Sequence, residues 1–363
     1  MNCYLGLTVP EPTYVPELFR SGVEAALEEV RRLAPRYLSP STPCSVELQM
    51  TGQRKHSYVG TIELRGPAGA RRFYLKTLRT HPNRLTVKRT ELEQEYALLE
   101  ELELRFAPYP GLQVVRPVRC WPEFASMLME EFPGETVERL LARAMSFPTA
   151  RALAQASTVC RRVGQWLALF QAFTKPASPD SFDPAEIVAY CARRLRLLEE
   201  TRQAGFAIIM PPAILGQVER LAGDIGSEDL GAVGRHNDFR PDNMLTDGEG
   251  VAVLDFTGFT YGPPLYDFMK FTMKLEDFAR GITLRPRAVA RWQTAFREGY
   301  GSPVELGSPL ARLLRVANSL DKMSELAGRH RTTTWSAVRR RHLRHCRTRL
   351  EEIGRVLEGG EVR

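Results

Sequence analysis

The chain has 363 residues, of which 43% are hydrophobic and 26% charged, and its formal net charge is +7. This length can bury a sizeable core and suits two lobes. No apolar run approaches the roughly 18 residues of a membrane span, and the first residues lack the basic start and apolar centre of a signal peptide. The six cysteines show no C-x-x-C spacing that would indicate a zinc site or a disulfide framework. We therefore expect a globular protein of the cytoplasm.

The predicted elements change character twice along the chain. Residues 1–40 are expected to form a helical extension, because apolar residues recur at helical spacing between Leu18 and Leu33. Residues 41–132 are strand-rich, with strands near 46–50, 58–64, 72–78 and 125–132 and one helix over 90–104. From residue 133 to the C-terminus helical patterns dominate, apart from a hairpin over about 243–255. The patterns favour an α+β protein with a small strand-rich N-lobe and a larger, mainly helical C-lobe.

The segment from His236 to Asn243, with the sequence HNDFRPDN, has the residue types of a phosphoryl-transfer site. Asp238 and Asn243 lie five residues apart on a predicted loop, and Asp255 follows the short apolar run 251–254. The first carboxylate can orient the attacking hydroxyl, while the amide and the second carboxylate are hard oxygen ligands suited to Mg²⁺. Positioning and charge neutralisation dominate this reaction, so a few side chains suffice. Their order and spacing match those of kinase active sites.

An ordinary Asp- and Asn-rich turn is the simpler alternative for this segment. The context favours the functional interpretation, because the turn Gly248-Glu249-Gly250 joins two apolar segments into one hairpin. Such a hairpin would bring Asp238 and Asp255 together.

With these motifs the chain resembles the kinase-like phosphotransferases of the aminoglycoside phosphotransferase and choline kinase type. The stretch 262–268, GPPLYDF, looks like the family's Gly-Asp-Pro-x-x-Asp-Leu motif. By that likeness Asp267 is the N-cap of a helix and braces the catalytic loop. The resemblance implies a bilobal protein-kinase-like fold that uses ATP or GTP together with Mg²⁺.

The same resemblance assigns roles in the strand-rich half. Lys76, on an alternating strand, stands where kinases carry the lysine that holds the α and β phosphates. Glu95 lies in a segment similar to the family's Glu-x-x-x-Leu and would orient Lys76. Four other acids of the same predicted helix compete for that role, namely Glu91, Glu93, Glu100 and Glu101.

The remaining nucleotide contacts are expected from two less specific segments. The strand that ends before Pro133-Gly134 resembles the hinge between kinase lobes, so Glu130 and Phe132 would bind adenine through main-chain carbonyl and N–H groups. The alternative is an edge strand that ends in a turn. Residues 51–57 contain no G-x-G-x-x-G motif, and candidates for capping the phosphates there are Arg54, Lys55 and Ser57.

Two further residues of the segment from His236 to Asn243, the predicted catalytic segment, need separate interpretation. His236 is expected to brace the loop by hydrogen bonds rather than to take part in the chemistry. Arg240 follows Asp238 by two residues, and its guanidinium could bind the γ-phosphate or could pair only with Asp242. We favour the catalytic role for Arg240, because a fixed positive charge would offset the charge that develops on the phosphoryl group.

Much of the positive charge lies near the C-terminus, on a predicted helix. Its arginines are Arg339, Arg340, Arg341, Arg344, Arg347 and Arg349, and its apolar spacing runs through Trp335, Val338, Cys346, Leu350 and Ile353. The commonest explanation is a docked amphipathic helix with a solvated basic face. The alternative is an anionic partner or membrane surface bound through Arg339–Arg349.

The function predicted from these patterns is phosphoryl transfer from a nucleotide to a hydroxyl of a small acceptor, such as a sugar, a glycoconjugate or an aminoglycoside-like compound. Two alternatives remain. A catalytically silent nucleotide-binding regulator would keep the fold but lack turnover, and the presence of every expected phosphoryl-transfer residue argues against it. A protein kinase would need a long activation segment, which the short stretch between Asp255 and Gly262 does not allow. Nucleic-acid binding is not expected, because it would rest on charge alone.

Overall fold

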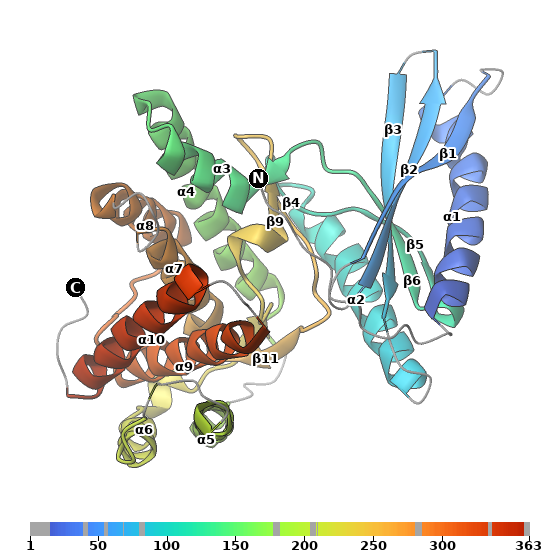
Figure 1. The fold of residues 1–363 in the computed structure, drawn as a ribbon. Coiled ribbons are helices and arrows are strands. Elements are labelled where there is room, and N and C mark those ends of the chain that lie inside the picture. The colour runs from blue at the N-terminus through green and yellow to red at the C-terminus, as the bar shows by residue number, and fades with distance from the viewer. Residues whose placement is uncertain are drawn as a thin grey trace. The chain divides into compact units, whose positions relative to one another are not determined.

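The computed structural model describes residues 15–38, 43–53, 57–67, 69–79, 84–176, 182–203, 208, 210–279, 285–332 and 336–358. The chain divides into two compact units, each drawn within Figure 1. The N-terminal unit comprises Met1–Gly134, Leu245–Asp247 and Ala252–Thr257, and the C-terminal unit comprises the rest. The two short inserted segments belong to the predicted hairpin, so this hairpin contributes residues to both units.

An antiparallel sheet of five strands forms the centre of the N-terminal unit, in the order β1-β2-β3-β6-β5. Its strands are β1 (Ser45–Gln53), β2 (Ser57–Gly66), β3 (Gly69–Leu78), β5 (Pro117–Trp121) and β6 (Ser126–Glu130). A short 3-10 turn, η2 (Pro122–Phe124), connects β5 to β6. The first strand is longer than the sequence pattern predicts, and its register shifts between Leu48 and Met50. This irregularity interrupts the alternation that marks strand length in the sequence.

Two helices pack on this sheet, α1 (Val15–Tyr37) and α2 (Leu85–Phe106). The small residues Ala26, Val30 and Ala34 of α1 pack against a cluster that includes Ile62, Leu64, Phe73, Leu75 and Leu128. Since successive strand residues point to opposite faces, Phe73 and Leu75 face α1 while the intervening positions of β3 face away from it. Helix α2 begins five residues earlier than predicted. Residues 1–14 and 39–40 of the predicted extension lie outside the described residues.

A second, smaller sheet carries the predicted hairpin. It includes β4 (Leu112–Val114), β9 (Met244–Thr246) and β10 (Val251–Val253), with β10 between the other two. All three residues of β10 are buried, as the continuous apolar run predicts. The amide of Val115 donates to the carbonyl of Val253 at 3.1 Å, which holds the end of β10 two residues before Asp255.

Helices make up most of the C-terminal unit. They are α3 (Val137–Ser146), α4 (Ala150–Phe173), α5 (Pro184–Gln203), α6 (Ile214–Gly223), α7 (Leu265–Ala279), α8 (Pro286–Tyr300), α9 (Pro309–Thr332) and α10 (Ser336–Leu357). The short strands β7 (Glu135–Thr136), β8 (Val233–Arg235) and β11 (Thr260–Gly262) and the 3-10 turns η3 (Ser227–Asp229) and η4 (Pro241–Asn243) complete it. Threonine side chains cap α3 and α4, because Thr136 and Thr149 accept hydrogen bonds from the amides of Arg139 and Ala152.

Two glycines allow α4 and α8 to approach closely. A Cβ atom added to Gly299 would lie 1.9 Å from the carbonyl oxygen of Arg161, and one added to Gly164 would lie 2.1 Å from the carbonyl oxygen of Phe296. Both obstacles are backbone atoms, which cannot rotate away as a side chain can. The spacing between these helices therefore requires glycine at both positions.

The C-terminal helix differs in part from the solvated basic face expected from the sequence. Arg340, Arg341, Arg344 and Arg347 are exposed, but the side chain of Arg349 is only 1% exposed. Arg349 donates to Asp277 at 2.7 Å and to Glu352 at 2.9 Å. Arg315, also buried, donates to Glu352 at 2.6 Å and to Glu276 at 2.8 Å.

These two arginines and three carboxylates form the buried ion network of α7, α9 and α10. Val338 also departs from the expected pattern, since it is exposed rather than packed. Trp335 lies outside the described residues, and the side chain of Arg339 does as well. Among the helices that the structure describes, none combines the length and the apolar character needed to cross a membrane.

Candidate active site

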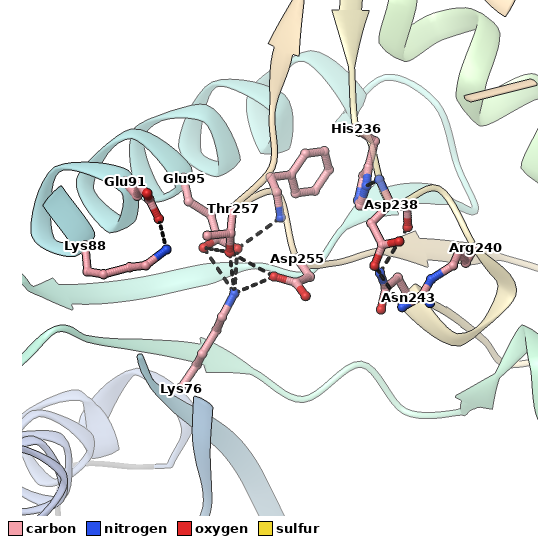
Figure 2. A network of polar contacts seen from close by, with 11 residues as sticks. Lys76, Lys88, Glu91, Glu95, His236, Asp238, Arg240, Asn243, Asp255 and Thr257 are labelled. Atoms are coloured by element: carbon pink, nitrogen blue, oxygen red, sulfur yellow. Dashed lines mark hydrogen bonds and ion pairs between the residues drawn. The ribbon is translucent and has the colours of Figure 1, made fainter. Parts of the chain in front are cut away.

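Lys76 is the centre of a polar network in the N-terminal unit (Figure 2). Its position on β3 turns it away from α1 and toward α2. The ammonium nitrogen lies 3.0 and 3.1 Å from the two carboxylate oxygens of Glu95, 2.7 Å from Oδ1 of Asp255 and 3.0 Å from the hydroxyl of Thr257. One cation thus joins the sheet, the helix and the segment that follows β10.

Glu95 is the acid of α2 that pairs with Lys76, whereas Glu91 pairs with Lys88. Glu95 is almost fully buried and also accepts from the amide of Phe256 at 3.0 Å and from the hydroxyl of Thr257 at 2.9 Å. A signal for this choice was present in the sequence. Leu92, Glu95, Leu99 and Leu102 have the spacing of one helix face, and all four are buried.

The electrostatics of this network favour a charged lysine. Burial alone would lower the pKa of Lys76, but the negative charges of Glu95 and Asp255 outweigh it and raise that pKa above its ordinary value. Asp255 adopts a positive φ of 69°, a conformation that costs free energy for any residue other than glycine. Its side chain is 41% exposed, so the carboxylate pairs with Lys76 and is still accessible to a further ligand.

The predicted catalytic segment, His236 to Asn243, lies in the C-terminal unit, where its side chains hold one another in place (Figure 2). The side-chain amide nitrogen of Asn243 donates to the carboxylate of Asp238 at 2.8 Å and to the main-chain oxygen of Asp238 at 3.0 Å. Arg240 lies 2.8 Å from Asp238 and 3.3 Å from Asp242, so it pairs with both acids rather than with Asp242 alone. The Asp238 side chain remains 39% exposed.

His236 and Asp267 support this segment from beneath. Both are fully buried, and the carboxylate of Asp267 accepts from the amides of His236 at 2.6 Å and Asn237 at 3.1 Å. Asn237 has a positive φ of 64°, which asparagine tolerates. The amide of Asp238 donates to Nδ1 of His236 at 3.3 Å. Burial raises the pKa of Asp267, although the nearby cations and the hydrogen bond from His236 oppose the shift.

One detail of the Asp267 prediction is wrong. Helix α7 begins at Leu265, so Asp267 lies inside its first turn and is not the N-cap. The proline pair that precedes the helix shifts its start, since proline has a backbone suited to helix entry. The carboxylate is therefore turned toward the loop amides instead of the amides of its own helix.

The sequence argument missed two residues of the site. Lys270, one turn after Asp267 on α7, donates to the carbonyl of Asn237 at 2.8 Å and lies 3.8 Å from a carboxylate oxygen of Asp238. Thr257 hydrogen-bonds to Lys76, Glu95 and Asp255. The spacing of Asp267 and Lys270 on one helix face could have indicated the first. We found no sequence signal for Thr257.

The weaker nucleotide candidates are placed as follows. The N–H of Glu130 donates to the carbonyl of Arg116, and its carboxylate accepts from Arg116 and Tyr37, so both groups are engaged within the protein. Phe132 follows β6 and forms no hydrogen bond with the rest of the described chain. Ser57 begins β2, opposite Leu78. Arg54 and Lys55 lie outside the described residues.

Comparison with known proteins follows from this geometry. A family model described as the phosphotransferase enzyme family matches residues 61–306, a span that holds Lys76, Glu95, Asp238, Asn243 and Asp255. The chain belongs to this family. It is therefore a phosphotransferase, as the sequence motifs predict. No curated protein sequence matches the chain.

Solved structures similar to this phosphotransferase agree on the fold. A protein of Ralstonia eutropha JMP134 described as a candidate aminoglycoside phosphotransferase is 16% identical, with 92% of this chain and 99% of that chain covered and a TM-score of 0.55. Amicoumacin kinase hAmiN, solved with AMP-PNP and Ca²⁺, is 15% identical over 92% and 96% of the two chains, with a TM-score of 0.51. A thermostable aminoglycoside phosphotransferase mutant is 14% identical over 85% and 95%, with a TM-score of 0.50. These likenesses show the α+β, kinase-like fold that the sequence predicts.

The residues present are chemically suited to a magnesium nucleotide. Asn243 uses its amide nitrogen to hold Asp238, so its oxygen is the atom presented as a ligand. The accessible carboxylate of Asp255 is a second hard ligand. Within the described ranges, no group of three or more His, Cys, Asp or Glu side chains is arranged to hold a metal ion.

Proposed function

We propose that this phosphotransferase moves the γ-phosphoryl group of ATP or GTP to a hydroxyl of a small molecule, with a sugar, a glycoconjugate or an aminoglycoside-like compound as the acceptor. Residues 41–132 bind the nucleotide, and the acceptor pocket lies within residues 133–363. The observation that carries the proposal is that the Asp238 carboxylate is held in place and is also accessible. Its carboxylate is fixed by Asn243 and Arg240 and yet remains accessible, which a base that receives a substrate proton requires.

The chemical step assigns one role to each group. The acceptor oxygen forms a bond to the γ-phosphorus while the bond from that phosphorus to the bridging oxygen breaks, and the nucleoside diphosphate leaves. Asp238 orients the hydroxyl and takes its proton. Lys76, held by Glu95, binds the α and β phosphates, and Arg240 offsets charge on the transferred group. Bound Mg²⁺, held by Asn243 and Asp255, would neutralise the phosphate charge.

Supporting contacts come from residues that touch neither substrate. Asp267 and His236 hold the backbone on either side of Asn237, so they fix where the Asp238 carboxylate points.

The carbonyl of Glu130 and the main chain of Phe132 are proposed to bind the base, with Ser57 near the phosphates. We place the enzyme in the cytoplasm, where ATP and GTP are available and where the five described cysteines, all free thiols, would remain reduced.

The proposal is tested by transfer of labelled γ-phosphate from Mg·ATP and Mg·GTP into pooled sugars, aminoglycosides, amino alcohols and phosphosugars. Asp238→Asn keeps the shape of the side chain and removes the base, and it should abolish transfer. Asp224→Asn, at an exposed aspartate at the C-terminal end of α6, is the matched control and should leave transfer unchanged. Label that enters protein but no small acceptor would overturn the proposal in favour of a protein kinase.

A further anionic partner, bound through α10, needs its own test. The exposed arginines of this helix include Arg340, Arg341, Arg344, Arg347 and Arg355. Binding to vesicles that contain anionic lipid should fall in an Arg344→Ala/Arg347→Ala variant if the helix binds such a surface. Equal binding by the variant and the original protein would leave a solvated basic face as the explanation.

A further inference from the structure

A cavity of about 520 Å³ lies in the C-terminal unit next to the catalytic segment. Its wall includes Arg240, whose guanidinium is 2.8 Å from Asp238. The other walls come from α3, α7, α9 and α10, which contribute both apolar side chains, such as Met145 and Phe278, and charged ones. Pockets for small ligands commonly have volumes of about 300–1,000 Å³. The cavity is therefore large enough for the remainder of an acceptor whose hydroxyl lies at Asp238.

The acids that line this cavity are mostly occupied by protein cations. Asp277 accepts from Arg349 at 2.7 Å, and Lys322 approaches it at 3.8 Å. Glu325 pairs with Lys322 at 3.1 Å and with Arg329. Glu138 forms no such pair with the residues that the structure describes, and its pKa is raised by burial and by the charge of Asp242. Three of the four lining acids are thus already paired with protein cations.

Two of the lining cations have no protein partner in the described part of the chain. Lys274, on α7, and Arg341, on α10, form no hydrogen bond or ion pair there. Arg341 is exposed to solvent, but Lys274 is partly buried. A partly buried ammonium group that is not directly paired with a carboxylate costs free energy that a bound anion would recover.

The surroundings of Lys274 increase this cost. Burial lowers the pKa of its ammonium group, and the positive charge of Lys322 lowers it further, against the weaker influence of Asp277 and Glu325. A neighbouring pair of lysines, one of them unpaired, is an arrangement that an anionic group stabilises through charge-assisted hydrogen bonds. A cationic acceptor would instead meet repulsion at this position.

We propose that this cavity binds the anionic end of the acceptor, a phosphate or carboxylate group held by Lys274 together with Lys322, while the acceptor hydroxyl lies at Asp238. The inference rests on the proposed function, since it names the class of acceptor for the same site. It favours phosphorylated or acidic sugars over aminoglycosides and amino alcohols, whose ammonium groups carry the opposite charge.

The first experiment tests the anion site without relying on turnover. Acylation of lysines by an amine-reactive reagent is followed residue by residue by mass spectrometry, with and without inorganic phosphate at constant ionic strength. Phosphate at about ten times its Kd should slow acylation of Lys274 by roughly tenfold, as site occupancy requires. The exposed Lys175 is the control, and its rate should not change. Equal rates for Lys274 with and without phosphate would overturn the proposal.

The second experiment compares matched acceptors that differ only in the anionic group, namely a hexose, its 6-phosphate and its uronic acid. The acidic sugars should have the higher kcat/KM, and the better of the two identifies the group. Lys274→Gln should lower the kcat/KM for the acidic sugar relative to the neutral hexose by roughly ten- to hundredfold, through a higher KM for the acidic sugar. Lys175→Gln should leave this ratio unchanged. Equal use of the neutral hexose would overturn the acceptor class. Protection of Lys274 without any transfer that depends on Asp238 would leave the anion site standing and defeat the proposed function instead.

Discussion

Replacement of Arg349 by alanine should destabilise the C-terminal unit far more than replacement of Arg347 on the same helix. The two arginines are two residues apart in a run that reads as one basic face, yet Arg349 is buried in the ion network of α7, α9 and α10 and Arg347 is exposed. Removal of one member of a buried ion pair leaves the other charge uncompensated, and this typically costs about 3–5 kcal/mol.

The contacts around Arg349 place the expected loss at the lower end of that range. Glu352 and Glu276 each keep Arg315 as a partner, at 2.6 and 2.8 Å. Asp277 keeps Lys322 at 3.8 Å and, when the imidazole is protonated, His345 at 3.3 Å. No carboxylate would be left without a cation. We therefore expect a loss of about 3 kcal/mol in the free energy of unfolding.

Differential scanning calorimetry provides the measurement. For a domain of about 150–250 residues, 1 kcal/mol corresponds to roughly 2–4 °C, so the Tm of the C-terminal unit should fall by about 6–12 °C in Arg349→Ala. Arg347→Ala should change the free energy of unfolding by less than about 0.5 kcal/mol. Similar Tm values for the two variants would refute the reasoning, because they would mean that the buried network contributes nothing beyond surface charge.

Four further outcomes are expected. Burial alone would raise the pKa of Asp277, but the contact with His345 and the charges of Arg349 and Lys322 hold this pKa far below its ordinary value. The stability that this shift provides is present above pH ~4 and is lost as the pH falls further, so acid unfolding should show a shallower pH dependence in Asp277→Asn. Gly299→Ala should lower the free energy of unfolding, measured with denaturant, by about 1–3 kcal/mol, because the added Cβ meets the backbone of Arg161. Gly328→Ala, where nothing lies within 4 Å of the added Cβ, should be neutral or slightly stabilising. An unchanged stability in Gly299→Ala would contradict the close helix contact. Thr257→Val, which keeps the shape but removes the hydroxyl that joins Lys76, Glu95 and Asp255, should raise the KM for Mg·ATP, and Thr257→Ser should restore it; equal KM values would show that the hydroxyl does not position these groups. Arg240→Ala should lower kcat by roughly a hundredfold, and an unchanged kcat would reduce Arg240 to a partner of the two aspartates.

The local arrangement of the candidate site could be predicted from the sequence because the residues of each part are close together along the chain. The tight loop fixes Asp238 relative to Asn243 within five residues, and an apolar strand with turn residues before it fixes where Asp255 emerges. Such short-range constraints depend on turn geometry and on the alternation of side chains along a strand. Both can be predicted from the residue types in a short stretch of sequence. The family match over residues 61–306 agrees with that interpretation.

Long-range packing determined what the sequence left open. Five acids of α2 could have paired with Lys76, and burial of the 92-95-99-102 face against the sheet selected Glu95. The arginines of α10 look alike in sequence, but Asp277 and Glu276 of α7 and Glu352 of α10 itself hold Arg349 inside. Arg347, two residues away, is exposed to water. The same packing brings Lys274 beside Lys322 from two helices about fifty residues apart along the chain. Charges from separate helices acquire their pKa values and partners only when tertiary contacts set their distances and remove water from between them.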